Sequence, residues 1–328
     1  MKKILLITTG GTISSEKTSE GLAPSSKNFT SFLDTVKECN IEVKNLLQLD
    51  SSNIQPEEWQ CMAETVAKEY INYDGIVLTH GTDTMGYTSS VLSFMLRNIP
   101  IPVVLTGSQL PISHPLTDGT ENLRCAIAMA CSGKSGVYVA FNRKVILGTR
   151  AVKVRTTGFD AFESVNFPNV AEINGGGLKI NEFALPHIKG DFSLDRELNK
   201  KVFLIKLTPG LNPGIFDMLI NMNYKGIVIE AFGAGGIHFI RRDLISKLRE
   251  TVGSGISVVV CSQCLYESSN FSIYQTGKRA LKTGVIQALD MTTEATVTKL
   301  MWALGKTSSQ NEIKNIFNTN FAGEISLI

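Results

Sequence analysis

The sequence predicts an α/β protein of two parallel-sheet domains, doubly wound in a flavodoxin- or Rossmann-like way. The larger domain is N-terminal and carries a β-hairpin, and the smaller one is C-terminal. Short β-branched runs alternate with helical patterns along the chain, as βαβ units require. The 328 residues also exceed the ~250–300 at which one hydrophobic core usually stops growing. The 28 glycines gather in short clusters, which suits loops whose backbone approaches a ligand.

Each element is predicted from its pattern. Strands are expected where short Val- and Ile-rich runs lead into polar or glycine-rich turns: 3–11, 45–52, 75–83, 101–109, 136–142, 202–210, 226–236 and 256–263. Helices are expected where apolar residues recur at helical spacing: 56–73, 84–98, 120–132, 213–223, 242–252 and 294–304. Residues 136–155 predict a hairpin with an Asn-Arg turn.

The domain boundary is predicted where periodicity fails. Residues 183–201 mix proline, glycine and charges without a regular apolar pattern. We therefore expect a site-bearing N-terminal α/β domain over 1–185, a linker over 186–201 and a C-terminal α/β domain over 202–328.

Composition excludes several classes of protein. The net charge of +2 argues against a nucleic-acid partner held by bulk electrostatics. No run approaches the ~20 apolar residues of a membrane span. The apolar run Ile4–Ile7 is too short for a signal peptide. Six cysteines without an export signal predict reduced thiols, so we expect a soluble, cytoplasmic protein with no membrane partner.

Hydroxyl and acidic side chains follow three consecutive predicted strands, within 8–14, 49–53 and 79–85. In open parallel sheets ligands bind beyond the carboxyl ends of the strands. The topology therefore predicts one pocket that holds Thr12, Asp50, Ser51, Ser52, Thr82 and Asp83.

Thr12 in Gly10-Gly11-Thr12 has two interpretations. It caps a helix after a tight turn, or it is a nucleophile and the glycines leave room for a substrate. The spacing fits neither a dinucleotide fingerprint nor a phosphate loop. Asp83 or Thr84 can likewise cap the helix that is predicted from residue 84.

A threonine nucleophile needs a base, because its hydroxyl barely ionises at neutral pH. The basic residues near a strand end all belong to the predicted hairpin: Arg143, Lys144, Arg150, Lys153 and Arg155. An arginine stays charged, whereas a desolvated lysine can lose its proton. Lys153 or Lys144 is thus the chemical choice, the alternative being that these charges are solvated.

Three motifs stand out together: TTGGTI near the N-terminus, HGTDTM about seventy residues later and TGSQLP over 106–111. Together they resemble the bacterial L-asparaginases, most closely the cytoplasmic, type I-like branch. Further similarity lies in 148–164, 224–236 and 290–305, so the resemblance covers essentially the whole chain.

The resemblance implies an L-asparagine amidohydrolase that forms a covalent aspartyl ester on Thr12. Thr82, Asp83 and Lys153 match the second hydroxyl, its acidic neighbour and the basic partner. Asp50, Ser51 and Ser52 match the loop that holds the substrate's α-carboxylate and α-amino groups, and Asp83 also reaches the amine. The family implies no cofactor or metal, L-asparagine as the small-molecule substrate, and a homodimer or homotetramer.

Three positions depart from the family pattern or bear on its regulation. Residues 14–26 match a lid, but Leu22 stands where many members have a tyrosine. Glu230 occupies the place of an arginine that binds a regulatory asparagine in some type I relatives, which argues against that regulation. Cys264 remains at a matching position.

Other functions stay open on the sequence alone. Glutamine differs from asparagine by one methylene, which a pocket discriminates by only ~1–3 kcal/mol. The ammonia-producing component of a tRNA-dependent amidotransferase would need an extra N-terminal domain, for which the first strand at residue 3 leaves no room. An amino-acid sensor needs no nucleophile or base, and a scaffold needs no polar pocket.

The CSQC motif over 261–264 and His80 are interpreted as structural.

Overall fold

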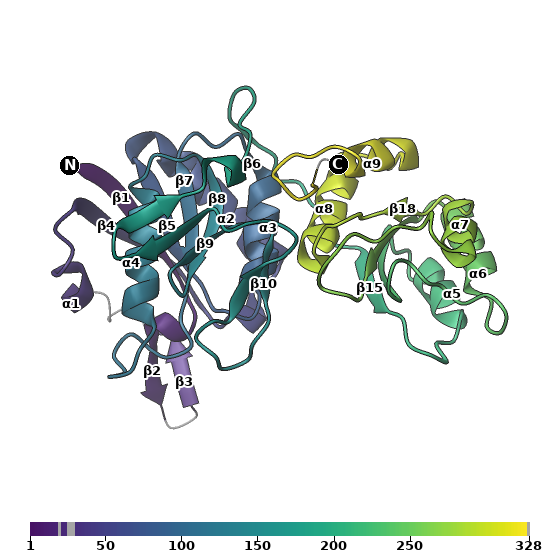
Figure 1. Ribbon diagram of the computed structural model, residues 1–328, viewed down its shortest axis with the longest axis horizontal. Helices are drawn as coiled ribbons and strands as arrows, with labels where there is room; N and C mark the ends of the chain where they lie inside the picture. Colours follow the sequence, from purple (N-terminus) through teal and green to yellow (C-terminus); the bar gives the residue numbers. More distant parts are fainter. Residues whose placement is uncertain (19–20, 25–29, 327–328) are drawn as a thin grey trace. The chain divides into compact units, whose positions relative to one another are not determined.

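The computed structural model describes residues 1–18, 21–24 and 30–326 of the chain. It forms two compact units, Met1–Arg196 and Glu197–Ile328, each built on its own sheet (Figure 1). The prediction of an α/β fold with two mainly parallel sheets is confirmed. The linker over 186–201 stays a prediction. No helix within the described ranges is long and apolar enough to cross a membrane.

Unit 1 is built on an eight-stranded sheet in the order β13-β12-β9-β8-β7-β5-β1-β4. Its parallel strands are β4 (Cys39–Leu49), β1 (Lys2–Gly10), β5 (Gly75–Thr79), β7 (Pro102–Thr106) and β8 (Gly136–Phe141). Counted along the chain, these five follow the spatial order 2-1-3-4-5, which is the flavodoxin-like winding. That winding reverses between β1 and β5, and the fold rule places a ligand at this switch point.

The antiparallel part of the sheet begins with the predicted hairpin. Its strands are β9 (Lys144–Leu147), β12 (Ala171–Asn174) and β13 (Gly177–Ile180). Asn142 and Arg143 join β8 to β9 with φ of 47° and 63°, as a two-residue type I′ turn requires. The Asn-Arg turn is thus confirmed.

Two sequence expectations are corrected by strand pairing. The predicted strand over 45–52 begins earlier, at Cys39, and ends at Leu49, because its first residues pair with β1 from Lys2 onward. Lys153 is not part of the β8–β9 hairpin. It ends β10 (Ala151–Lys153), which pairs with β11 (Phe162–Ser164) in a separate small ladder.

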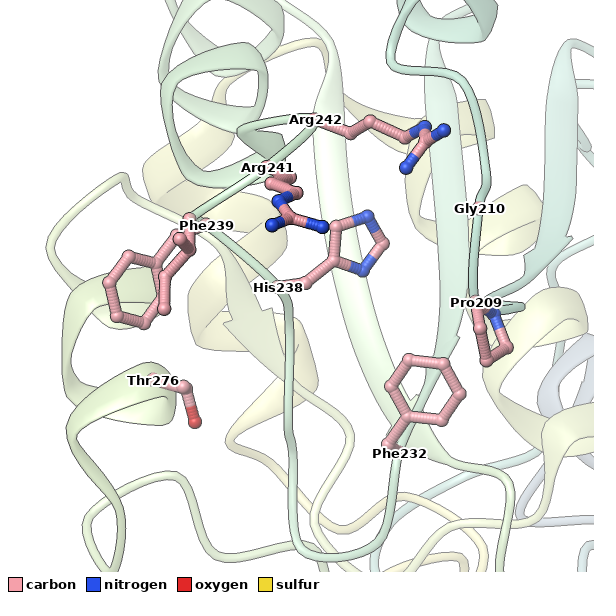
Figure 2. A pocket seen from close by; sticks show the side chains of 9 residues that line it. Pro209, Gly210, Phe232, His238, Phe239, Arg241, Arg242 and Thr276 are labelled. Atoms are coloured by element: carbon pink, nitrogen blue, oxygen red, sulfur yellow. The ribbon is translucent and has the colours of Figure 1, made fainter.

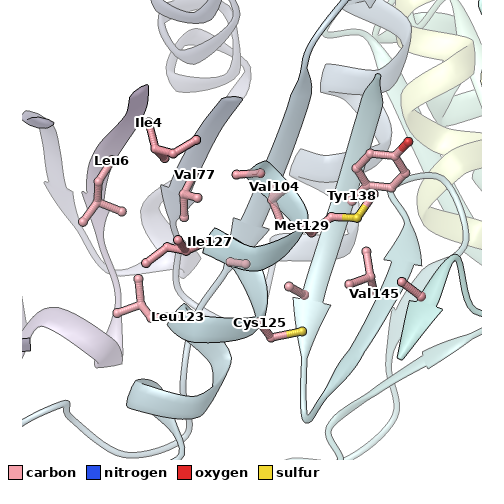
Figure 3. Close-up of a cluster of buried hydrophobic side chains, with 14 of the residues drawn as sticks. Ile4, Leu6, Val77, Val104, Leu123, Cys125, Ile127, Met129, Tyr138 and Val145 are labelled. Atoms are coloured by element: carbon pink, nitrogen blue, oxygen red, sulfur yellow. The ribbon is translucent and has the colours of Figure 1, made fainter. Parts of the chain in front are cut away.

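Helices cover the parallel strands of unit 1. They are α2 (Pro56–Glu69), α3 (Met85–Met95) and α4 (Gly119–Ala130). On one face, Leu6, Val77 and Val104 of neighbouring strands pack against Leu123 and Met129 of α4 (Figure 3). Strands β5 and β7 are buried along their whole length, which shows that both faces are covered.

The remaining elements of unit 1 are short. They are β2 (Ser15–Thr18), β3 (Gly21–Pro24), α1 (Thr30–Leu33), β6 (Leu96–Arg97), β14 (Ser193–Leu194) and the 3₁₀ turns η1 (Thr12–Ser14), η2 (Ser51–Asn53), η3 (Tyr70–Asn72) and η4 (Glu182–Ala184). β2 and β3 pair as a hairpin inside the segment predicted to be a lid. Residues 19–20 and 25–26 of that segment lie outside the described residues.

Unit 2 has a four-stranded parallel sheet. Its strands are β15 (Val202–Lys206), β16 (Gly226–Ala231), β17 (Ser257–Ser262) and β18 (Ile286–Gln287). Its helices are α5 (Gly214–Asn221), α6 (Leu244–Gly253), α7 (Gln275–Leu281), α8 (Thr293–Lys306) and α9 (Gln310–Phe317). Ile227 and Ile229 join the apolar cluster of α5 and α6, whereas Val228 joins that of α8 and α9. The sheet is therefore doubly wound.

Two glycines bring the ends of β1 and β5 into backbone contact. A Cβ placed on Gly11 would lie 2.6 Å from the Gly81 Cα, a distance that real side chains do not tolerate. Gly11 also has φ 79° and ψ 175°, a region that is essentially restricted to glycine. Glycine at residue 11 therefore permits the approach of the two loops that carry Thr12 and Thr82.

We predict that Gly11→Ala destabilises unit 1 more than Gly133→Ala. Gly133 also has a positive φ of 73°, but no described atom lies within 4 Å of a Cβ there. Alanine at residue 133 costs only the free energy of holding a residue with a Cβ at positive φ, about 1–2 kcal/mol. Gly11→Ala adds a collision with the Gly81 backbone, which costs ~1–3 kcal/mol more. Urea unfolding measures both free energies, and equal losses would show that the close approach is not required.

Candidate active site

The candidate site lies where β4, β1, β5 and β7 end at the same edge of the sheet. The Gly11 amide donates to the Leu49 carbonyl at 3.0 Å, and the His80 amide donates to the Thr106 carbonyl at 2.8 Å. These bonds join the loop after β1 to the end of β4, and the loop after β5 to the end of β7. Since a Cβ on Gly11 would lie 2.6 Å from the Gly81 Cα, the three strand ends singled out in the sequence lie together.

Thr12 opens η1 directly after Gly11, half-buried. Within the described part of the chain, its hydroxyl has no hydrogen-bond partner. The alternative interpretation, that Thr12 caps a helix, is not met, since Gly11 is the N-cap residue of η1 and no side chain of the described residues caps this turn. The hydroxyl is therefore available to a bound molecule, as a nucleophile must be.

Lys153, the last residue of β10, bonds to the loop after β5. Its ammonium donates to Thr82 Oγ1 at 2.7 Å and to Asp83 Oδ1 at 2.6 Å. Thr82 is buried and the Lys153 side chain is 17% exposed, whereas that of Asp83 is 63% exposed. The three residues form a cluster with its hydroxyl and ammonium shielded and its carboxylate open to water.

The structure distinguishes Lys153 from the other basic candidates. Arg143 pairs with Glu121, and Arg155 pairs with Asp160 and Glu163. Arg150 is fully buried with its guanidinium 5.3 Å from the Phe167 ring centre. Lys144 begins β9, opposite Phe141 of the hairpin. Of the five, Lys153 is the residue that bonds to Thr82.

Asp50, Ser51 and Ser52 form the turn after β4, but they serve different contacts. Asp50 Oδ1 accepts from the Ser52 amide at 2.8 Å and from the Ser52 hydroxyl at 2.6 Å. These hydrogen bonds lower the pKa of the Asp50 carboxyl, so it is ionised at neutral pH. Asp50 and Ser52 are both exposed at the site.

Ser51 is buried, and it holds the neighbouring loop in place. Its Oγ accepts from the Asp83 amide at 3.3 Å, and its carbonyl accepts from the Thr84 hydroxyl at 2.8 Å. A Cβ on Gly81 would lie 2.5 Å from the Ser51 Oγ. The structure thus places Ser51 between the loops after β4 and β5.

His80 is fully buried and lies in a chain of hydrogen bonds behind the site. The Trp59 indole donates to Thr88 Oγ1 at 2.9 Å, and that hydroxyl lies 3.0 Å from His80 Nε2. His80 Nδ1 lies 2.7 Å from the Gly81 carbonyl. Burial lowers the pKa of His80 to about 4, so the neutral ring donates from Nδ1 and accepts at Nε2.

Gln109 is a site residue whose contacts the TGSQLP motif did not predict. Its Nε2 donates to the carbonyls of Thr156 and Gly158 at 3.1 and 3.0 Å. Its Oε1 lies 3.5 Å from Thr82 Oγ1. Asp118 accepts from the Gln109 backbone amide. Only the position of Thr156 in space could have identified this bridge.

Leu22, Glu230 and Cys264 are the positions that depart from the family pattern or bear on its regulation. The side chain of Leu22 lies outside the described residues. Glu230 is the penultimate residue of β16 in unit 2 and accepts from the Thr293 hydroxyl at 2.7 Å. Cys264 is an exposed free thiol, whereas burial raises the pKa of the Cys261 thiol to about 12. In the ranges that the structure describes, no three His, Cys, Asp or Glu side chains are grouped to hold a metal.

Comparison with known proteins matches both halves of the chain. The profile described as asparaginase, N-terminal, covers residues 3–185, and that of the glutaminase/asparaginase C-terminal domain covers 201–317. The chain is 46% identical over 329 residues to an L-asparaginase of Thermococcus kodakarensis, with 99% of each chain covered. The solved structure of the thermostable L-asparaginase from this organism has a TM-score of 0.94 at 45% identity, covering 99% of this chain and 100% of that one.

A second kind of relative is a component of the glutamyl-tRNA(Gln) amidotransferase of Pyrococcus furiosus. It is 40% identical over 298 residues, which cover 88% of this chain and 67% of that protein. The similarity to this relative is thus confined to part of its length.

We predict that His80 makes the protein less stable as pH falls below 6.5. The unfolded histidine takes up a proton near its ordinary pKa of 6.5, whereas the folded one does so only near 4. By linkage this costs about 2 kcal/mol of stability at pH 5. Urea unfolding at neutral pH and near pH 5 measures the loss in the wild type and in His80→Gln. If both lose the same free energy, His80 is not the titrating group.

Proposed function

Because the chain belongs to the asparaginase family, we propose that it hydrolyses L-asparagine to L-aspartate and ammonia. Both family domains match in order, and the L-asparaginase of Thermococcus kodakarensis matches along 99% of each chain. The observation that carries the proposal is the cluster of Thr82, Asp83 and Lys153, together with a Thr12 hydroxyl that is unpartnered within the described residues. A module that only bound an amino acid would need neither a nucleophile nor a basic partner.

Thr12 is the proposed nucleophile. Its oxygen attacks the side-chain amide carbon of asparagine, and its proton passes through a base to the departing nitrogen, which leaves as ammonia. The product of this first step is an ester between Thr12 and the aspartyl group. Water then attacks the ester, which releases L-aspartate and returns the proton to the Thr12 oxygen.

Thr82 and Lys153 are the proposed proton-transfer pair. The 2.7 Å contact between Lys153 Nζ and Thr82 Oγ1 supports this role, since a general acid or base must lie within hydrogen-bond reach of its partner. Asp83 accepts a second hydrogen bond from the lysine at 2.6 Å. Gln109 Oε1 lies 3.5 Å from the same Thr82 hydroxyl and is proposed to orient it.

Asp50 and Asp83 are proposed to bind the α-amino group of the substrate. Both carboxylates are exposed at the site, and Lys153 is the cation that pairs with Asp83. Two carboxylates and one cation leave a net negative charge, which favours binding of an ammonium group over a further anion. Ser51 and Ser52 are proposed to hold the α-carboxylate, as the family resemblance implies; in this structure the Ser52 hydroxyl and amide donate to Asp50.

The finer expectations stay proposals. These are the bacterial type I-like branch, a homodimer or homotetramer, a reaction without a cofactor, and a cytoplasmic location, which six free thiols favour. Glutamine is the second substrate to test, because one methylene changes pocket affinity by only ~1–3 kcal/mol. The similarity to an amidotransferase component covers 67% of that relative, so it supports this activity less than the L-asparaginase match does.

We predict that Thr12→Ala lowers ammonia release from L-asparagine by at least about a thousandfold, because it removes the attacking oxygen. Thr12→Ser keeps a hydroxyl and retains part of the rate. Thr65→Ala is the matched control, since the Thr65 hydroxyl bonds to Cys61 of its own helix. Ammonia is measured with L-asparagine and with L-glutamine. If Thr12→Ala stays active, Thr82 takes the role of nucleophile; if the wild type only binds asparagine, the protein is a sensor.

We predict that Lys153→Arg does not restore the activity that Lys153→Met loses. Arginine keeps the charge beside Asp83, but it cannot be deprotonated in proteins, so it cannot accept the threonine proton. Both variants are expected to lose about 10²–10⁴ in kcat. The kcat and KM for L-asparagine separate the effects. Near-normal kcat in Lys153→Arg would show that the residue acts only through its positive charge.

A further inference from the structure

Unit 2 contains a cavity at the carboxyl edge of its own parallel sheet. The cavity has a volume of about 550 Å³, which is the size of a small-molecule site. Pro209 and Gly210 follow β15, Phe232 follows β16, and residues 238–242 precede α6 (Figure 2). It thus lies where the doubly wound fold places ligands, in the unit that lacks Thr12, Thr82 and Lys153.

Two arginines at this cavity are available to a ligand. Arg241 and Arg242 are both exposed, and neither guanidinium forms an ion pair or hydrogen bond with a residue in the described ranges. Figure 2 shows the Arg241 guanidinium beside the His238 ring and the Arg242 guanidinium directed towards the chain at Gly210. Two such groups can bind an anion through paired hydrogen bonds.

His238 adds a buried polar atom. Its Nε2 is buried and has no hydrogen-bond partner among the residues that the structure describes. Such an atom costs free energy unless a bound group satisfies it. The imidazole lines the cavity together with Arg241 (Figure 2), and protein atoms cover its Nε2 in this structure.

The loop that carries the two arginines is held in shape. Asp243 caps α6 by accepting from the Ser246 amide at 3.1 Å and from its hydroxyl at 2.6 Å. Arg242 has φ 52°, a backbone conformation that residues other than glycine adopt at some cost in free energy. Strained residues of this kind persist where the surroundings fix them, commonly at ligand sites.

The walls of the cavity are apolar. Phe232, Phe239 and Pro209 line it together with Ile240. The Arg279 guanidinium lies 4.2 Å from the Phe239 ring centre and supports that ring. An inorganic anion would bind the arginines but leave these surfaces without contact.

We propose that this cavity binds a small organic carboxylate with an apolar or aromatic body. The carboxylate binds Arg241 and Arg242, and its apolar part packs against Phe232 and Phe239. The residues of this cavity all belong to unit 2, whereas Thr12, Thr82 and Lys153 belong to unit 1, and the proposal does not rest on the proposed function.

The test is calorimetric titration of the full chain with 3-phenylpropionate, and with 3-phenylpropanamide as the uncharged control. We expect binding of the acid with a Kd in the millimolar range or tighter, and binding of the amide at least about tenfold weaker. Arg241→Gln combined with Arg242→Gln should weaken the acid at least about tenfold. Lys282→Gln, which removes an exposed charge that does not line the cavity, should change nothing.

Three results would overturn the proposal: no binding of the acid by the wild type, equal binding by the double arginine variant, or equal binding of the amide. Titration with inorganic phosphate tests the apolar part, since phosphate binding as tight as that of the acid would contradict a role for the phenylalanines. Thr12→Ala should bind the acid normally, and the double variant should keep its wild-type rate of ammonia release. Failure of the second site is thereby distinguishable from failure of the proposed catalytic one.

Discussion

The backbone contact between Gly11 and Gly81 is the constraint on which the candidate site depends. Thr12 and Thr82 each follow a glycine at the end of a parallel strand, and neither loop forms the site alone. A Cβ on Gly11 would lie 2.6 Å from the Gly81 Cα, so any other residue would push the two loops apart. Since the sheet reverses its winding between β1 and β5, this contact lies at the switch point where flavodoxin-like folds bind ligands.

Around that contact, the polar groups of the site are already bonded to one another. Ser51 binds the loop of Asp83, Asp50 binds Ser52, and Lys153 binds Thr82 and Asp83. The Thr12 hydroxyl differs from them in having no partner within the described residues. Such an arrangement needs little rearrangement when a substrate arrives, which is the condition for efficient electrostatic stabilisation of a transition state.

Local patterns account for what could be predicted. The alternation of strands and helices, the Asn142-Arg143 turn and the clustering of polar strand ends follow from periodicity, turn chemistry and the direction of parallel strands. The errors arose from pairing. β4 starts at Cys39 because β1 pairs with it there, and Lys153 belongs to the ladder of β10 with β11. Pairing is set by residues far away in the chain, so no local pattern specifies it.

The fold class, the family resemblance and the loops of the candidate site were therefore readable from the amino-acid sequence, because these depend on neighbours in the chain. Which basic side chain contacts which hydroxyl could not be read from residue spacing. Lys153 and Thr82 are separated by 71 positions, and four other basic residues of the same segment were candidates. Tertiary folding also made Gln109 bridge to Thr156 and placed Arg241 and Arg242 at an apolar cavity. Such contacts arise where folding brings distant segments together, and residue spacing does not encode them.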